Sequence, residues 1–437
     1  MKKIYFKDLK EYFNQDIEVQ GFIDNIRDLQ YVQFIVLRDT TGKIQITIEK
    51  NDDNKKLNDI VSTLTCESTI KVVGKLLKNE KVKLNGMEII PTDIEITSKC
   101  LKDLPFNYKD SSSALLDTKL DYRFIDLRSE KNILMFKVQS YLIEVMREFL
   151  YKENFIEIHT PKLIGAASES GSEVFEVKYF EEKAFLAQSP QFYKQMAIAS
   201  GFEKIFEVAP AFRAEKSNSY RHATEFTSFD IEFSGIDSYE DVMNMQENML
   251  NYALNKVKEK YGEKIKEYFD IEVVLPKNPF PRIKLEDLYK ELEKRYNYKL
   301  PAEDIGDMNS EAEKLTSKFA MEEYESEFIF VTDFSPKKRA FYHMRKDGIP
   351  QGYDLIWRGC EITTGAQREH IYEVLKDQAK EKGLGKDVEF YLEFFEYGCP
   401  PHGGFGLGVD RITMLLLGTK SLKETMFLFR GPNRLTP

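Results

Sequence analysis

The sequence predicts an α+β protein in which a small β-barrel precedes a larger domain built on an antiparallel sheet flanked by helices. Short alternating strands with turn residues fill residues 17–97. From about residue 131, longer strands are punctuated by helices without strict β-α-β alternation. The 437 residues are enough for two or three domains with a sizeable core.

The N-terminal barrel is expected from period-2 alternation of apolar residues. Strands are expected at 17–23, 33–39, 43–48, 69–77 and 87–97. Thr41-Gly42 supplies a tight turn between the second and third strands. Five short strands suit an OB-fold, so we assign residues 1–102 to such a domain. Residues 103–130, which carry Pro105 and a run of three serines, are interpreted as a hinge.

Residues 131–437 are assigned to the second domain. Apolar residues at helical spacing predict a long helix over 133–151 and another over 236–262, and the polar segment 300–325 is also expected to be helical. The region 236–325 is interpreted as a peripheral helical insertion. Strands are expected near 155–159, 184–188, 205–212, 225–234, 328–333, 353–364 and 404–409.

Composition excludes several classes of protein. The net charge is −10, and residues 1–100 hold 16 basic and 16 acidic side chains, so the acidic excess lies in 101–437. Bulk charge therefore argues against a sequence-blind nucleic-acid binder. No apolar run approaches a membrane span, and the N-terminus becomes charged early, so we expect a cytoplasmic protein. Sparse cysteines and scattered histidines predict neither disulfides nor zinc.

Two distant motifs predict a nucleotide site. Arg213 and Glu215 are two residues apart, which places them on one face of a strand. Downstream, the glycine-rich run 403–408 leads to Arg411 at the start of an apolar helix. Guanidinium groups bind phosphate oxygens bidentately and stack on bases, so two arginines can clamp a nucleotide triphosphate. Taken singly, each motif could be a surface ion pair or a loop without a ligand.

Together these motifs resemble those of the class II aminoacyl-tRNA synthetases. The segment from Phe212 through Glu232 resembles motif 2, and the segment from Gly404 to Arg411 resembles motif 3. Residues 156–161 resemble the strand and proline of motif 1, which in the family lies at the dimer interface. An OB domain before the catalytic domain marks the subclass of the aspartyl, asparaginyl and lysyl enzymes. The resemblance implies ATP as a substrate, tRNA as a partner and a homodimer.

Two further segments resemble those of aspartyl enzymes of the archaeal and eukaryotic kind. In residues 188–195, Lys194 matches the lysine that faces the carboxylate of the substrate side chain, and in residues 365–369, Arg368 completes that recognition. Two cations converging on one small pocket would repel each other unless an anion lay between them. An arginine with a lysine favours a carboxylate over an amide, which implies L-aspartate. As an isolated residue, Lys194 could instead be an exposed lysine paired with an acid.

The resemblance assigns further residues to ATP and aspartate. The ATP-binding set comprises Arg213, Glu215, His222, Phe226, Glu361, Gly408 and Arg411. The aspartate-binding set comprises Glu169, Ser172, Gln191, Lys194, Arg213, Thr364 and Arg368. Arg411 and Phe226 are expected to stack on the two faces of the adenine, and Glu169 and Gln191 to hold the substrate ammonium.

Glu361 and Thr364 match the family's magnesium ligands, and hard oxygen ligands suit that ion. Outside this context, Glu361 would be read as a solvated strand carboxylate. Arg213, Arg411 and Glu361 are expected to carry catalysis. The implied reaction is attack of the aspartate carboxylate on the α-phosphorus of ATP, followed by transfer to the terminal ribose of tRNA. Both reactants of the first step are anions, so charge neutralisation and in-line geometry matter more than a protein nucleophile.

The resemblance also implies a tRNA-binding surface. The residues that match it are Phe34, Gln45 and Glu88 as anticodon readers, Asn25 and Arg27 as weaker candidates on the same surface, and Ser217 and Asn218 at the acceptor end. An exposed aromatic residue on an OB strand can stack on a base. By itself, however, Phe34 is more often a core residue, because an alternating strand buries half of its side chains.

Three functions stay open on the sequence. The first is an aspartate–tRNA ligase acting on tRNA(Asp), with tRNA(Asn) as a second candidate partner. The second is an asparagine–tRNA ligase, against which Lys194 and Arg368 argue. The third is a non-catalytic paralogue that only binds tRNA, which would usually have lost Arg213, Glu361 or Arg411; all three are present.

Overall fold

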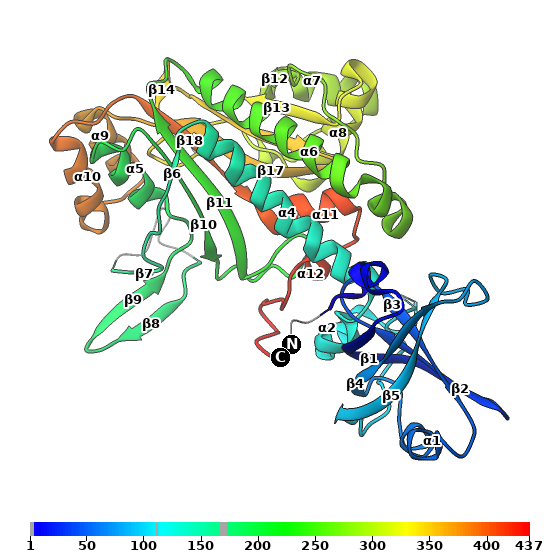
Figure 1. Ribbon diagram of the computed structural model, residues 1–437. Coiled ribbons are helices and arrows are strands. Elements are labelled where there is room, and N and C mark those ends of the chain that lie inside the picture. Colours follow the sequence, from blue (N-terminus) through cyan, green and yellow to red (C-terminus); the bar gives the residue numbers. More distant parts are fainter. Residues whose placement is uncertain (1–3, 111, 166–172) are drawn as a thin grey trace. The chain divides into compact units, whose positions relative to one another are not determined.

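A computed structural model describes residues 4–110, 112–165 and 173–437. The chain divides into two compact units, Met1–Asn107 and Tyr108–Pro437 (Figure 1). Among the described residues, no helix combines the length and the apolar composition needed to cross a bilayer.

The first unit is a closed five-stranded barrel, which confirms the expected OB-fold. The strand order is β1-β2-β3-β5-β4. The strands are β1 (Asp16–Asp28), β2 (Val32–Arg38), β3 (Lys43–Glu49), β4 (Thr69–Lys78) and β5 (Met87–Ser98), with a 3-10 helix at Phe6–Tyr12 and α1 (Lys55–Ser62). Alternate residues such as Ile35 and Leu37 on β2 are fully buried, so the period-2 pattern fills the barrel with apolar side chains.

The second unit is built on an eight-stranded sheet of order β12-β13-β16-β17-β18-β11-β10-β6. The strands are β6 (Ile156–Glu157), β10 (Lys204–Phe212), β11 (Glu225–Ser234), β12 (Arg282–Lys284), β13 (Phe328–Thr332), β16 (Gly352–Trp357), β17 (Cys360–Gln367) and β18 (His402–Gly408). Neighbouring strands are antiparallel except at the two edges, where β6 pairs with β10 and β12 with β13 in parallel. The single strand expected over 353–364 is a hairpin, because Arg358 and Gly359 both adopt positive φ and turn the chain.

Two long helices, α4 (Glu130–Lys152) and α6 (Tyr239–Phe269), cross one face of this sheet (Figure 1). Ser129 caps the start of α4, and a capping box of Ser238 with Asp241 starts α6. The interpretation of 236–325 as a peripheral insertion is therefore wrong for α6. Its apolar stripe, including Met243, belongs to the central core of the unit.

Helices α7 (Leu285–Tyr296) and α8 (Ser310–Tyr324) form a separate apolar cluster against the β12–β13 end of the sheet. The remaining elements are the sheet of β7 (Leu163–Ile164), β9 (Glu182–Leu186) and β8 (Glu176–Tyr179), the pair β14 (Arg345–Lys346) and β15 (Ile349–Pro350), and the helices α2 (Leu116–Asp121), α3 (Arg123–Asp126), α5 (Gln191–Ala199), α9 (Tyr372–Glu381), α10 (Glu389–Glu396), α11 (Val409–Leu417) and α12 (Leu422–Thr425), with 3-10 turns at Ala302–Asp304 and Lys386–Val388.

The segment expected to be a hinge is partly ordered into the second unit. Arg123 on α3 is 2% exposed, and its guanidinium donates to the backbone carbonyls of Glu424, Met426 and Phe427. Its charge is balanced by Asp126. A buried arginine with this many partners anchors α3 to the second unit.

Candidate active site

A cavity of about 300 Å³ opens among β11, β17, β18, α5 and α11 of the second unit. It brings together nearly all residues expected at ATP or aspartate: Gln191, Lys194, Arg213, Glu215, His222, Phe226, Glu361, Thr364, Arg368, Gly408 and Arg411. Glu169 and Ser172 are the exceptions, because they lie outside the described residues.

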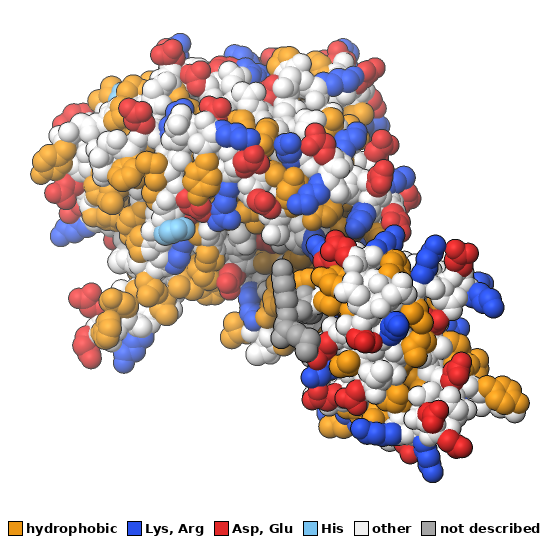
Figure 2. Space-filling model, viewed as in Figure 1, with side chains coloured by type: hydrophobic (Ala, Val, Ile, Leu, Met, Phe, Trp, Pro, Cys, Tyr) orange, Lys and Arg blue, Asp and Glu red, His pale blue; other side chains and the backbone are white. Residues whose placement is uncertain are grey.

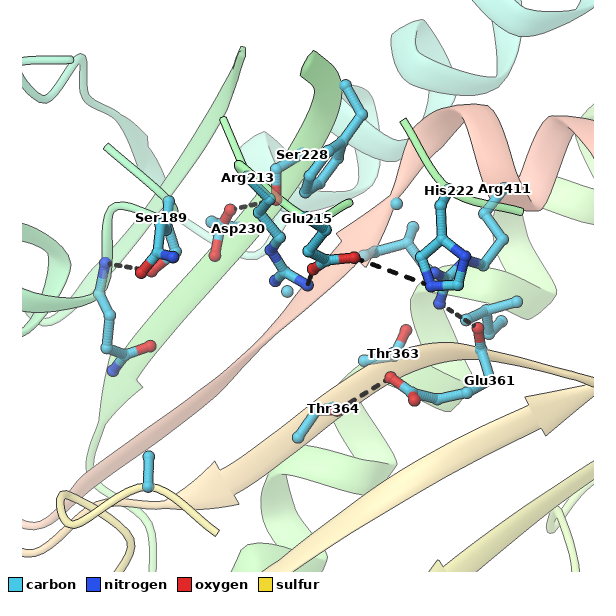
Figure 3. Close-up of a pocket in the computed structure, with 18 of the residues that line it drawn as sticks. Ser189, Arg213, Glu215, His222, Ser228, Asp230, Glu361, Thr363, Thr364 and Arg411 are labelled. Atoms are coloured by element: carbon cyan, nitrogen blue, oxygen red, sulfur yellow. Dashed lines mark hydrogen bonds and ion pairs between the residues drawn. The ribbon is translucent and has the colours of Figure 1, made fainter. Parts of the chain in front are cut away.

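One wall of the cavity carries the motif 2 arginine. Arg213 Nη1 lies 3.7 Å from Glu215 Oε1, and its guanidinium stands 5.4 Å from the ring centre of Phe226. Glu215 in turn lies 3.8 Å from His222 Nε2 (Figure 3). Burial, together with the positive charges of three arginines, lowers the pKa of His222 more than Glu215 raises it. Here Phe226 faces Arg213; the expected adenine slot between Phe226 and Arg411 stays a prediction.

Arg411 lies in the first turn of α11 and also lines the cavity. Its Nη1 donates to the backbone carbonyl of Glu361 at 2.7 Å (Figure 3). Burial raises the pKa of the Glu361 carboxyl, but the charges of Arg411 and Arg339 outweigh it, so the pKa lies below its ordinary value. Glu361 is therefore an ionised carboxylate inside the cavity, not a solvated strand acid.

Three side-chain oxygens converge next to Arg411. The Thr364 hydroxyl lies 3.0 Å from Glu361 Oε1 and 2.9 Å from Asp354 Oδ1. One hydroxyl proton cannot serve both carboxylates at once. Burial raises the pKa of Asp354 to about 7; its two contacts with Arg339 oppose the shift and Glu361 adds to it. The two carboxylates and the hydroxyl are hard oxygen ligands, and one hydroxyl hydrogen is too few to bond to both carboxylates. Such a group of oxygens suits a divalent cation such as Mg²⁺.

Asp354 was not expected at the site from the sequence. The signal was present, because this acid interrupts an otherwise apolar strand, and aspartate is rarely buried without a partner.

Lys194 and Arg368 reach the same cavity, but they are already paired. Lys194 Nζ lies 3.2 Å from both Asp230 Oδ1 and Glu232 Oε2, and Arg368 Nε donates to Glu232 Oε1 at 2.9 Å. Glu232 is fully buried, and Lys194 is 2% exposed. The anion expected between the two cations is thus supplied by the protein itself. The cluster of two cations and two carboxylates is neutral, so the cation pair alone does not decide between a carboxylate and an amide substrate.

Helix α5 places its residues by helical spacing. Gln191, Lys194 and Gln195 lie three and four positions apart, so they share one face. That face is buried, with exposed fractions of 5%, 2% and 0%. The alternative of an exposed Lys194 paired with a nearby acid is therefore wrong about exposure, although the lysine does pair with the acids Asp230 and Glu232.

The glycine-rich run was expected at the nucleotide site, but Gly404 instead lies against the neighbouring strand β11. A Cβ there would lie 2.0 Å from the carbonyl oxygen of Ile231 and 2.4 Å from Glu232 Oε2. Glycine at this position lets the neighbouring strand and its buried carboxylate approach, rather than a ligand. Gly406 and Gly408, by contrast, do line the cavity.

Helix α8 contributes a residue that the sequence did not predict. Glu313 is 3% exposed; its Oε2 accepts from Arg221 Nη1 at 2.5 Å and from the backbone N–H of Glu361 at 2.8 Å. It therefore ties the motif 2 loop to the strand that carries Glu361. Its only sequence signal is an acid in a helix that looked polar and peripheral.

In the first unit, the residues expected to read the anticodon share one face of the barrel. Phe34 is half-buried rather than core, and the guanidinium of Arg27 lies 5.5 Å from its ring centre. Phe34 pairs across the strands with Thr47, which bonds to both Gln45 and Glu88. Asn25 is exposed two residues before Arg27. In the second unit, Ser217 and Asn218 lie on the exposed motif 2 loop.

Comparison with known protein families bears on this geometry. The family model described as tRNA synthetases class II (D, K and N) matches residues 116–430, and the model described as OB-fold nucleic acid binding domain matches residues 17–97. The chain belongs to the class II tRNA synthetases of the D, K and N group. The resemblance and the fold class predicted from the sequence are confirmed.

Relatives of this synthetase cover its full length. It is 41% identical to Aspartate--tRNA(Asp) ligase of Pyrococcus furiosus, over 99% of both chains. It is also 41% identical to Aspartate--tRNA(Asp/Asn) ligase of Methanopyrus kandleri, over 100% of both.

Solved structures of both amino-acid specificities resemble the synthetase. Asparaginyl-tRNA synthetase from Pyrococcus horikoshii, complexed with asparaginyl-adenylate, matches at 28% identity and a TM-score of 0.91, over 100% of both chains. Aspartyl tRNA synthetase from Entamoeba histolytica matches at 29% identity and a TM-score of 0.87, over 100% of this chain and 93% of the other. The fold is therefore shared by enzymes for aspartate and for asparagine.

Proposed function

We propose that the chain is an ATP-dependent aspartate–tRNA ligase. It activates L-aspartate to aspartyl-adenylate and transfers the aspartyl group to the 3′ end of tRNA. The observation that carries this proposal is the single cavity that joins Lys194 and Arg368 to Arg213 and Arg411. The full-length relatives with aspartate ligase names support the same amino acid.

The first step needs charge neutralisation rather than a protein nucleophile. Arg213, half exposed beside the cavity, is placed to contact the α-phosphate and the attacking carboxylate. Arg411 would exchange its bond with the Glu361 carbonyl for phosphate oxygens. Both guanidinium groups stabilise negative charge that grows on the phosphoryl oxygens, and they hold the reactants in line. Glu215, Phe226 and the other ATP residues would position the base and the far phosphates.

The substrate side-chain carboxylate would join the cluster of Lys194, Arg368, Asp230 and Glu232. Lysine has three donor hydrogens and arginine five, so each cation can bond to Glu232 and to a ligand together. Glu232 fixes the two cations near each other before substrate binds. An amide in the same place would offer only one acceptor oxygen to the two cations, whereas a carboxylate offers two.

We propose that Glu361 and Thr364 hold Mg²⁺, with Asp354 as a further oxygen ligand. Their convergence and the ionised state of Glu361 fit this ion. When bound, the ion would offset the charge of the triphosphate. The raised pKa of Asp354 would then fall as its carboxylate binds the cation.

We propose that the OB-fold reads the anticodon and that the motif 2 loop contacts the acceptor end of tRNA. The face with Phe34, Gln45 and Glu88 combines a partly exposed aromatic ring with polar groups. Acidic and basic side chains are interspersed over the surface in Figure 2, so placed residues rather than bulk charge would bind tRNA(Asp). Whether tRNA(Asn) is also aminoacylated would depend on how this face of the OB-fold binds its anticodon.

We further propose a cytoplasmic homodimer that pairs through the motif 1 segment. Ile156 on β6 and Tyr151 at the end of α4 are both about half exposed, although they flank the core of the unit. Such apolar groups at a sheet edge suit a second copy of the chain. The molar mass in solution, measured by light scattering, tests this point.

ATP–pyrophosphate exchange tests the main proposal. Exchange that depends on L-aspartate and not on L-asparagine is expected. Exchange with asparagine alone would identify an asparagine–tRNA ligase, for which the neutral cluster and the asparaginyl-tRNA synthetase of similar fold are the supporting observations. Exchange with neither would identify a non-catalytic paralogue. Aminoacylation of purified tRNA(Asp) and tRNA(Asn) would then define the partner.

A further inference from the structure

A chain of buried hydrogen bonds runs from the β18 strand to Gln191 at the start of α5. Its members are His402, Gln195 and Gln191, with Tyr391 of α10 as a side branch. His402, Gln195 and Tyr391 are fully buried. The chain reaches the cavity only through Gln191, which lines it.

The direction of the first bond is set by the backbone. His402 Nδ1 lies 2.8 Å from the carbonyl oxygen of Pro400, and a carbonyl oxygen only accepts. Nδ1 must therefore carry the proton. The imidazole is neutral, because burial lowers the pKa of His402 to about 4. Nε2 is consequently an acceptor.

This acceptor orients the amides that follow. Gln195 lies 3.0 Å from His402 Nε2, so the atom it presents there must be its NH₂ group. Its oxygen then faces away and accepts from Tyr391 Oη at 3.0 Å and from Gln191 Nε2 at 2.8 Å. Amide orientation cannot be read from shape alone, but here the donor and acceptor requirements allow one answer.

We propose that this relay makes His402 a positioning residue for recognition of the substrate ammonium. Because the NH₂ group of Gln191 is bound to Gln195, its carbonyl oxygen is the atom left for the cavity. An oxygen attracts an ammonium group, whereas an NH₂ group repels it. The inference rests on the proposed amino-acid substrate and on Gln191 as its ammonium ligand.

Reversal of the relay shows why His402 matters. If the group at 402 donated to Gln195, the Gln195 oxygen would turn toward it. The NH₂ group of Gln195 would then face Gln191, which would offer its own oxygen in return and its NH₂ group to the substrate. The acceptor Nε2 of His402 therefore decides, through Gln195, whether Gln191 presents its oxygen or its NH₂ group to the substrate ammonium.

His402→Phe tests the relay because it keeps a ring that stacks on Phe395 but removes the acceptor. We expect the KM for aspartate in ATP–pyrophosphate exchange to rise about 10-fold, the scale of one charge-assisted hydrogen bond, with the KM for ATP within about twofold. His402→Gln can donate to Pro400 and accept from Gln195 with one amide, so it should restore most of the affinity. Cys399→Ala, beside the ring but outside the relay, is the matched control.

Competitive inhibition by 2-hydroxysuccinate separates polarity from packing. Its hydroxyl can donate or accept, so His402→Phe should weaken this inhibitor much less than it weakens aspartate. Equal weakening of both, a parallel rise in the KM for ATP, or equal losses in His402→Phe and His402→Gln would each overturn the relay. Absence of aspartate-dependent exchange in the unaltered protein would instead refute the proposed function.

Discussion

Removing Arg368 should separate substrate recognition from the stability of the buried cluster. In Arg368→Leu, Glu232 stays fully buried with Lys194, 3.2 Å away, as its remaining cation in the cluster. Breaking a buried ion pair costs about 3–5 kcal/mol, and the remaining lysine places the loss near 3 kcal/mol. Loss of a charged hydrogen bond to the substrate carboxylate costs about 1.5–3 kcal/mol more in binding, or about 10- to 150-fold in the KM for aspartate.

The double variant Arg368→Leu/Glu232→Gln isolates the two effects. It returns the cluster to neutrality, because Lys194 keeps Asp230 as its partner. Thermal unfolding should recover at least half of the lost stability, while aspartate-dependent pyrophosphate exchange stays impaired and the KM for ATP changes less than about twofold. Aspartate activation at the unaltered level in the double variant would show that Arg368 only neutralises Glu232, and the assignment of the substrate pocket would fail.

Three other changes follow from the same geometry. Glu313→Gln keeps an acceptor for the Glu361 N–H but loses the charge that pairs with Arg221, so the KM for ATP should rise about 10-fold. As a control, Ser317→Ala removes another contact of α8, the one with the Gly359 N–H in the same turn, and should leave the KM for ATP unchanged. Equal effects of the two variants would show that Glu313 does not link Arg221 to Glu361. Phe34→Ala should weaken tRNA binding by about 1–3 kcal/mol in filter binding and leave pyrophosphate exchange intact; a loss of both would indicate a folding defect. Burial lowers the pKa of His402 from 6.5 to about 4, although the charge of Glu232 opposes the shift. Between pH 6.5 and about pH 4 the unfolded chain therefore binds more protons at this residue than the folded protein does. The free energy of unfolding consequently falls as the pH falls through this range. From pH 8 to pH 5 the protein should lose about 2 kcal/mol more than His402→Gln does, and parallel thermal-unfolding curves would contradict this.

Local patterns in the chain were enough for the fold class and for most of the cavity. The barrel strands follow from period-2 alternation and turn residues, which act within a few positions. Arg213 and Arg411 could be named because each belongs to a short motif whose spacing reflects local geometry, whereas Glu361 was assigned only through the family resemblance. Most expected strands and helices have a counterpart in the structure, but the strand expected over 353–364 is a hairpin, the helix expected over 300–325 begins only at Ser310, and α6 belongs to the core.

Only the tertiary structure showed which charged side chains of the site lie in contact with one another. Glu232 lies between Lys194 and Arg368 because β11 pairs with β18 in a register that brings it beside Gly404. Glu313 reaches Glu361 because α8 packs against the β13 end of the sheet. Phe34 faces outward, and a shift of one residue along β2 would have buried it. Cross-strand register and helix docking depend on the burial of the whole core, and no local window of sequence contains that information.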